Sequence, residues 1–300
     1  MTATPARRRH VSRIVLALCA AATPTLHAQF AAYDFASTGC ANERGLLRAG
    51  FEDRDTVSPT GGPSGGSGGA FPGGQSLTVT SPAGTHTVLL YVPGAYTADQ
   101  AWPLVVALPG AAGSAAAAPA AANQIRALWA PVAEREGVLM VVPIASGTQG
   151  GWVPGIDQPA VACALDVVAR DYSIDLDRRY LWGFSAGAHF GHALALGNPG
   201  RFAAYAVNAG ALEVLSCSAG GAYACATTLP QIARRIPASL RVGESDPLRA
   251  HAQADANRFR AAGWVEPDRL GHAEFFGGHA VDAAEVEAAW AWFAPRRLPD

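Results

Sequence analysis

Short runs of continuously apolar residues recur along the chain. Residues 104–108 and 138–142 are apolar at every position. Strands that face water on one side alternate apolar and polar residues, whereas strands covered on both faces are apolar throughout. The pattern therefore predicts an α/β fold, with a mostly parallel sheet and helices on both of its faces.

Eight strands and five helices are expected after residue 75. The strands are 76–80, 86–92, 104–108, 138–142, 180–183, 204–208, 239–242 and 273–276. The helices are 123–136, 158–170, 186–197, 249–262 and 282–293. The alanine-rich stretch 114–122 is either a loop or the start of a helix.

The first 28 residues have the order of a secretory signal peptide. Arginines cluster at positions 7–9 and 13, an apolar run covers 14–22, and small residues lead to Ala28. Such a run is too short for a stable transmembrane helix. We expect cleavage near Ala28, a secreted or periplasmic protein, and no stable membrane insertion. The alternative, a buried N-terminal helix, leaves the arginine cluster unexplained.

Four cysteines remain after the leader, an even number as expected of an exported chain. A short loop favours a Cys217–Cys225 disulfide, which leaves Cys40 to pair with Cys163. The alternative is four unpaired, buried thiols. The cysteines and histidines do not follow a metal-binding spacing, so no metal is expected.

Three segments follow the leader. Residues 29–58 mix aromatic and acidic residues and have no assigned role. Residues 59–75 are rich in glycine and are predicted to form a flexible linker. Residues 76–300 are expected to form one catalytic domain.

The net charge of the chain indicates that nucleic acid is not its partner. The 22 basic residues are all arginine and oppose 24 acidic residues, which gives a net charge of −2. Without the leader, 18 arginines oppose the same 24 acidic residues, a net charge of −6. Nucleic acid is therefore not an expected partner, and the sequence leaves the oligomeric state open.

The strongest chemical signal is the sequence Gly183-Phe-Ser-Ala-Gly187, a G-x-S-x-G motif between a predicted strand and a predicted helix. This context is typical of a nucleophile elbow, a strained turn that exposes a serine above the start of a helix. Ser185 is the predicted nucleophile. The alternative is a structural Gly-Ser turn.

A serine nucleophile needs a base and an orienting carboxylate. His279 follows the last predicted strand and is the predicted base; His272, its competitor, precedes that strand and is expected at the opposite edge. Asp246 follows the strand before and is the predicted acid. Glu244 is the second choice for that role, and helix capping is the other interpretation of Asp246.

Backbone amides must stabilise the negative charge that develops on the substrate's carbonyl oxygen. The amide of Ala186, directly after the serine, is one expected donor. The turn after residues 104–108 reads Pro109-Gly-Ala-Ala-Gly113. The amide of Ala111 is the expected second donor.

Several stretches resemble known proteins. They are Tyr91-Val-Pro93, Pro103 to Gly110, Tyr172 to Asp175, Arg179 to Gly187, Pro199 to Phe202 and Ala209-Gly210. The chain resembles the α/β-hydrolases, and especially secreted polyhydroxybutyrate depolymerases and feruloyl or acetylxylan esterases. The resemblance implies a cofactor-independent esterase acting on a small or polymeric ester. One departure is Pro109, which stands where the family usually has histidine.

The substrate is less well specified. Phe184, Trp152 and the insert 211–230 are expected near the pocket, although Trp152 could equally be a packing residue. A serine peptidase of the same fold is the first alternative, because a triad does not distinguish esters from amides. A catalytically weak ligand-binding homologue is the second.

Overall fold

The computed structural model describes residues 40–42, 45–47, 62–66, 69, 72–215, 229–232 and 234–298. Within these residues, ten strands form one sheet in the order β10-β9-β8-β7-β5-β6-β4-β3-β1-β2. The strands are β1 Cys40–Asn42, β2 Gly45–Leu47, β3 Gly73–Ser81, β4 Gly84–Val92, β5 Trp102–Leu108, β6 Leu139–Pro143, β7 Ile174–Phe184, β8 Ala204–Asn208, β9 Ala238–Gly243 and β10 Leu270–Phe275.

The sheet is parallel from β5 and β6 through to β10, and antiparallel from β4 to β2. Strands β5, β6 and β8 are buried at every position, which explains their uninterrupted apolar sequences. The predicted α/β architecture is confirmed.

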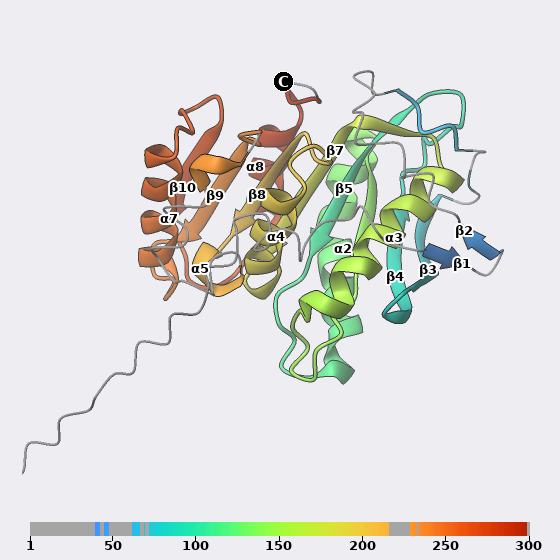
Figure 1. The fold of residues 1–300 in the computed structure, drawn as a ribbon, viewed down its shortest axis with the longest axis horizontal. Helices are drawn as coiled ribbons and strands as arrows, with labels where there is room; N and C mark the ends of the chain where they lie inside the picture. The colour runs from blue at the N-terminus through green and yellow to red at the C-terminus, as the bar shows by residue number, and fades with distance from the viewer. Residues whose placement is uncertain are drawn as a thin grey trace, which may run out of the picture.

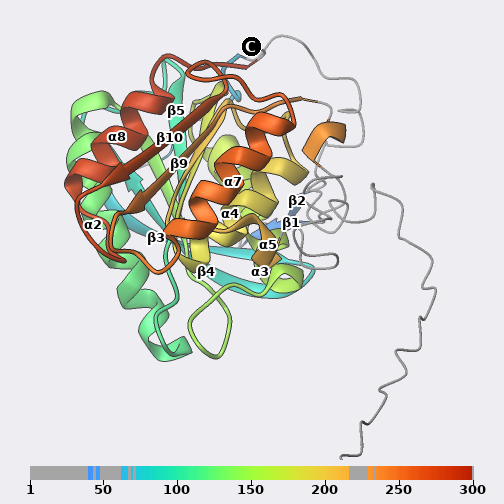
Figure 2. The same cartoon turned by 90° about the vertical axis from the view of Figure 1, so that its left-hand side faces the viewer.

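Helices cover both faces of the sheet, as Figures 1 and 2 show. They are α2 Ala118–Glu136, α3 Pro154–Asp171, α4 Ala186–Gly197, α5 Leu212–Leu215, α7 Arg249–Ala261 and α8 Ala283–Phe293, with 3-10 turns η1 Ala115–Ala117 and η2 Leu229–Gln231. Helices α2 and α8 share one face, where Trp129, Tyr180 and Phe293 pack together. Helices α3, α4 and α7 cover the other (Figure 2).

The predicted strand and helix ends were partly wrong. Helices α2 and α3 begin five and four residues earlier than expected, each with a proline in its first turn, where proline's missing N–H costs nothing. Strand β10 begins at Leu270 rather than residue 273 and ends before Phe276, which is 95% exposed. His272 therefore lies inside the strand rather than before it.

Part of the expected linker packs against the body. Strand β3 begins at Gly73, and the amide of Ser64 donates a hydrogen bond of 2.8 Å to the carbonyl oxygen of Ile174. The predicted signal peptide lies outside the described residues. In the part of the chain that is described, no helix is long and apolar enough to cross a membrane.

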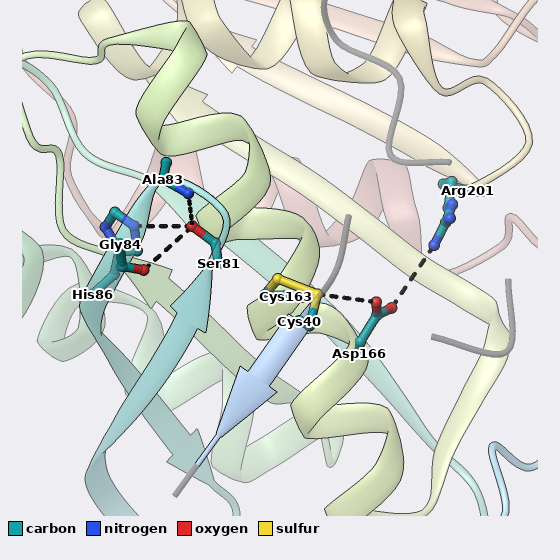
Figure 3. Close-up of a disulfide and its surroundings, with 8 residues drawn as sticks. All are labelled: Cys40, Ser81, Ala83, Gly84, His86, Cys163, Asp166 and Arg201. Atoms are coloured by element: carbon teal, nitrogen blue, oxygen red, sulfur yellow. Dashed lines mark hydrogen bonds and ion pairs between the residues drawn. A yellow bond between two sulfur atoms is a disulfide. The ribbon is translucent and has the colours of Figure 1, made fainter. Parts of the chain in front are cut away.

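A disulfide joins the edge of the sheet to a helix. Cys40 on β1 and Cys163 on α3 are both fully buried, with a Cα–Cα distance of 5.3 Å (Figure 3). A carboxylate oxygen of Asp166 lies 3.7 Å from the Cys40 sulfur; a disulfide sulfur has no hydrogen to donate, so this is a contact and not a hydrogen bond. The predicted Cys40–Cys163 pair is present, whereas Cys217 and Cys225 lie outside the described residues.

Removing this disulfide is expected to destabilise the protein. It links positions 123 residues apart, and the chain-entropy model assigns such a link about 5 kcal/mol. The double variant Cys40→Ala/Cys163→Ala should lose about 2 to 4 kcal/mol in the free energy of unfolding, measured with denaturant without reductant. The matched control is Cys217→Ala/Cys225→Ala, which removes the predicted disulfide that would close a shorter loop. A Cys40/Cys163 variant as stable as wild type would contradict the prediction.

Candidate active site

The turn between β7 and α4 holds Ser185 in a backbone conformation that side-chain-bearing residues rarely adopt. Its φ and ψ are 53° and −118°. The amide of Ser185 donates a hydrogen bond of 3.0 Å to the carbonyl oxygen of Asn208 on β8. Strain of this kind persists only where the surroundings impose it, and it is common at functional sites.

The two glycines of the motif are required by close backbone approach. A Cβ on Gly183 would lie 2.4 Å from the carbonyl oxygen of Gly187, and a Cβ on Gly187 would lie 2.1 Å from that of Leu108. Both distances are shorter than any tolerated contact. Any side chain at either position would therefore push the start of α4 away from strands β5 and β7.

Ser185, His279 and Asp246 form a continuous hydrogen-bonded chain. The Oγ of Ser185 lies 2.8 Å from Nε2 of His279, and Nδ1 of His279 lies 2.8 Å from Oδ2 of Asp246. A carboxylate can only accept, so Nδ1 carries the proton and Nε2 is free to accept one from the serine. The arrangement matches a base-activated nucleophile with an oriented base.

Asp246 is buried, whereas His279 is accessible to solvent. The side chain of Asp246 is 1% exposed, whereas that of His279 is 35% exposed. The second oxygen of Asp246 accepts a hydrogen bond of 2.7 Å from the amide of Leu248. Asp246 is thus fixed by the turn that begins α7, while His279 can meet a ligand.

The loops that carry the acid and the base are bonded to each other. The amides of Glu244 and Ser245 donate to the carbonyl oxygens of Phe275 and Gly277, each at 2.9 Å. Glu244, the second choice for the acid, is exposed. The carboxylate that His279 contacts is that of Asp246.

The other histidines near the motif have packing environments. His272 lies within β10, opposite Leu240 of β9, and burial lowers its pKa. Its Nε2 is buried without a hydrogen-bond partner. His189 accepts a hydrogen bond of 2.8 Å from the amide of Ala211. His192 is fully buried, with Nδ1 3.1 Å from the hydroxyl of Tyr205.

The loop that follows β5, residues 109–113, lies directly beside the nucleophile. A Cβ on Gly110 would be 3.3 Å from Cβ of Ser185. A second loop, residues 147–152, forms two hydrogen bonds with this loop and a third with Ala115 just after it. They are Ala112 N to Gly150 O at 3.1 Å, Ala115 N to Thr148 O at 3.0 Å, and Trp152 Nε1 to Pro109 O at 2.9 Å.

Residues 147–152 are themselves anchored. The ring of Trp152 stacks on Phe190 of α4 with centroids 5.0 Å apart. The buried carboxylate of Asp157 accepts hydrogen bonds from the amides of Ser146 and Val153 at 3.2 and 2.6 Å, and burial raises its pKa. These contacts match the packing interpretation of Trp152. Sequence reasoning missed Asp157, which a helix-start signal after Val153 could have indicated.

A buried polar network supports the elbow from the side of α8. Asn208, whose carbonyl holds Ser185, accepts from Trp182 Nε1 at 3.0 Å and donates to Glu285 at 2.8 Å. Glu285 is also paired with Arg241 at 2.6 Å. Sequence reasoning missed this network, because an acidic residue in the first turn of a helix is ordinarily exposed.

A cavity of about 600 Å³ opens beside His279. The loop Pro109–Ala112, one face of α2, Phe184 and residues 279–281 line it. Phe184 is part of this lining, whereas Trp152 is not. Among the described residues, no three His, Cys, Asp or Glu side chains converge to hold a metal ion.

Comparison with known proteins gives a fold but no close relative. No family model matches the chain, and no curated protein matches it. Among solved structures, a ferulic acid esterase superimposes with a TM-score of 0.60 at 15% identity, over 75% of this chain and 99% of that one. An S-formylglutathione hydrolase from Agrobacterium tumefaciens has a TM-score of 0.56 at 18% identity, over 76% and 96%.

A third structure, the fluorophosphonate-binding serine hydrolase F of Staphylococcus aureus with substrate bound, has a TM-score of 0.54 at 13% identity, over 74% of this chain and 99% of that one. These similarities, together with the mostly parallel sheet, decide the fold. The chain has the α/β-hydrolase fold. Within this fold, Ser185 follows β7, Asp246 lies in the turn after β9 and His279 in the loop after β10.

Burial of His192 in helix α4 is expected to make the stability of the protein depend on pH. Burial lowers its pKa from 6.5 to about 3. Below pH 6.5 the unfolded chain therefore binds a proton that the folded chain refuses, and the free energy of unfolding falls as pH falls towards 3. Urea unfolding between pH 7.5 and 4.5 should show a slope up to about 1.4 kcal/mol per pH unit steeper in wild type than in His192→Gln.

The comparison uses slopes, so a less stable variant remains informative. Groups that titrate in this range and do not interact with His192 contribute equally to both proteins and cancel. Parallel slopes in wild type and variant would contradict the prediction.

Proposed function

We propose that the protein is a serine hydrolase that cleaves carboxylic esters through an acyl-enzyme. The observation that carries the proposal is the hydrogen-bonded chain from Ser185 through His279 to Asp246, with both distances at 2.8 Å. A serine hydroxyl is a weak nucleophile without a base, and this chain supplies the base in the correct tautomer.

Each residue has a distinct role in the proposed reaction. Ser185 Oγ attacks the ester carbonyl while its proton moves to Nε2 of His279, and the amides of Ala186 and Ala111 bind the resulting oxyanion. The tetrahedral intermediate expels the alcohol, which takes the proton from His279. Water then attacks the acyl-enzyme by the same route and regenerates Ser185. Asp246 stabilises the imidazolium that forms in both steps.

The acyl group we propose is of the polyhydroxyalkanoate, feruloyl or acetyl type. The support is the sequence resemblance and the similarity of the fold to a ferulic acid esterase. A peptidase would use the same triad, so amide hydrolysis is the competing activity. The complete hydrogen-bonded chain favours turnover over a ligand-binding role without catalysis.

We further propose that the protein is exported, with residues 1–28 as its signal peptide. The Cys40–Cys163 disulfide supports this, because disulfides persist mainly in oxidising compartments. A secreted or periplasmic location follows.

The triad proposal is tested with a fluorophosphonate probe and a short-chain aryl ester, using residues 29–300. We expect a covalent adduct on Ser185 by peptide mass mapping, together with ester turnover that exceeds aminoacyl amide turnover. Ser185→Ala and His279→Ala should each lower kcat by about 10⁴-fold or more. His272→Ala is the matched histidine control and should retain activity.

Loss of activity in His272→Ala but not in His279→Ala would overturn the assignment of the base. No adduct in a folded sample would favour the binding role, and faster amide cleavage would favour the peptidase.

The indole of Trp152 is expected to position the loop of residues 109–113, which carries the proposed oxyanion donor Ala111. Trp152→Phe keeps an aromatic ring against Phe190 but removes the hydrogen bond to the carbonyl of Pro109. A misplaced amide at Ala111 would weaken transition-state binding, so kcat should fall about tenfold to a hundredfold with KM little changed. Steady-state kinetics on the aryl ester measure both constants.

Trp264→Phe is the matched control. It also loses an indole hydrogen bond to a backbone carbonyl, that of Ile236 at 2.8 Å, but lies at the end of the sheet remote from the site. It should lose stability without losing kcat. Equal kcat in Trp152→Phe and wild type would show that the loop needs no such support.

A further inference from the structure

The cavity beside His279 has one wall formed by a single helix face. The residues of this wall are Ala117, Ala120, Ala121, Gln124, Ile125 and Leu128. Their spacing of three and four residues places all of them on the same side of the helix and the turn before it. Alanine at the three positions nearest the start of α2 leaves space between the helix and the residues that follow His279.

The cavity is directly connected to the reacting groups. Ala111, the proposed oxyanion donor, and His279, the proposed base, both belong to its lining, as do Ala280 and Val281. In the proposed reaction the leaving alcohol oxygen must take its proton from Nε2 of His279. The cavity between α2 and residues 280–281 is therefore placed to receive the group attached to that oxygen.

Among the residues that line the cavity, His279 is the one whose side chain can carry a charge. His279 and Gln124 are its two polar side chains, and the remaining lining residues are apolar or glycine. Arg126 is the nearest arginine along α2, but it donates hydrogen bonds to the carbonyl oxygen of Gln75 at 2.8 Å and to Asn123 at 2.7 Å. A carboxylate placed in the cavity would lose water without gaining a cation.

We propose that this cavity binds the alcohol part of the ester and selects an uncharged, apolar alcohol. The inference rests on the proposed esterase function and adds to it the class of leaving group. Its volume of about 600 Å³ falls within the range of small-molecule sites and accommodates an alkyl or aryl alcohol.

The test compares two ester series in wild type and in variants that fill the cavity. One series keeps the acetyl group and lengthens the alcohol from methyl to hexyl; the other keeps methanol and lengthens the acid from acetyl to hexanoyl. Ala121→Phe and, independently, Ala120→Phe should lower kcat/KM for hexyl acetate by about tenfold or more. Methyl acetate and methyl hexanoate should change by less than about threefold.

The matched control is Ala127→Phe, an exposed alanine on the same helix that is not part of the cavity lining. It should leave both series unchanged. A loss of kcat/KM that increases with the length of the acid, or that is equal in both series, would overturn the proposal. It would leave the proposed esterase function intact. A wild type that hydrolyses none of these esters and takes no fluorophosphonate would instead refute the proposed function itself.

A charged alcohol tests the selectivity. Wild type should prefer hexyl acetate to the acetate ester of 6-hydroxyhexanoate by about tenfold in kcat/KM. Gln124→Arg adds a cation to the cavity wall and should reduce that preference about fivefold, with methyl acetate unaffected. Equal rates on the two esters in wild type, or a preference that Gln124→Arg leaves unchanged, would contradict the selection of an uncharged alcohol.

Discussion

The start of helix α4 passes in backbone contact with strand β5, and this contact determines where the reactive serine lies. No side chain fits at Gly187, because its Cβ would be 2.1 Å from the carbonyl oxygen of Leu108 and 2.5 Å from that of Pro109. The approach places Ser185 beside the loop that follows β5, and it aims the positive end of the helix at the same point. The positions of Ser185 and of the proposed oxyanion donors thus depend on one steric constraint.

The rest of the site is built by loops that hold one another. The turn that carries Asp246 donates two backbone hydrogen bonds to the segment that leads to His279. Residues 109–113 are hydrogen-bonded to residues 147–152. All of these loops follow the carboxyl ends of parallel strands, where open α/β sheets ordinarily bind ligands. Their mutual bonds hold the side chains of the candidate site in place.

Ser185, His279 and Asp246 could be proposed together from the sequence because their signals are local. A G-x-S-x-G turn, a histidine after the last strand and an aspartate after the strand before it each follow from one short stretch. The supporting residues were not predictable in this way. Asp157 reaches back 11 positions to Ser146, and Asn208 and Glu285 are 77 positions apart. A buried carboxylate in a helix also has the same local sequence as an exposed one. Strand β10 was misplaced for a related reason: His272 interrupts its apolar pattern, and pairing with β9 overrides that local preference.

Proline at position 109 illustrates how a departure from a family pattern can be accommodated. Proline has no N–H, so the loop loses one backbone donor, and its ring fixes φ. What remains available at this residue is the carbonyl oxygen, and it is the group that Trp152 holds at 2.9 Å. The indole is in turn held by Phe190, which belongs to the same helix that Ser185 begins. The loop after β5 and helix α4 are therefore connected through the side chain of Trp152.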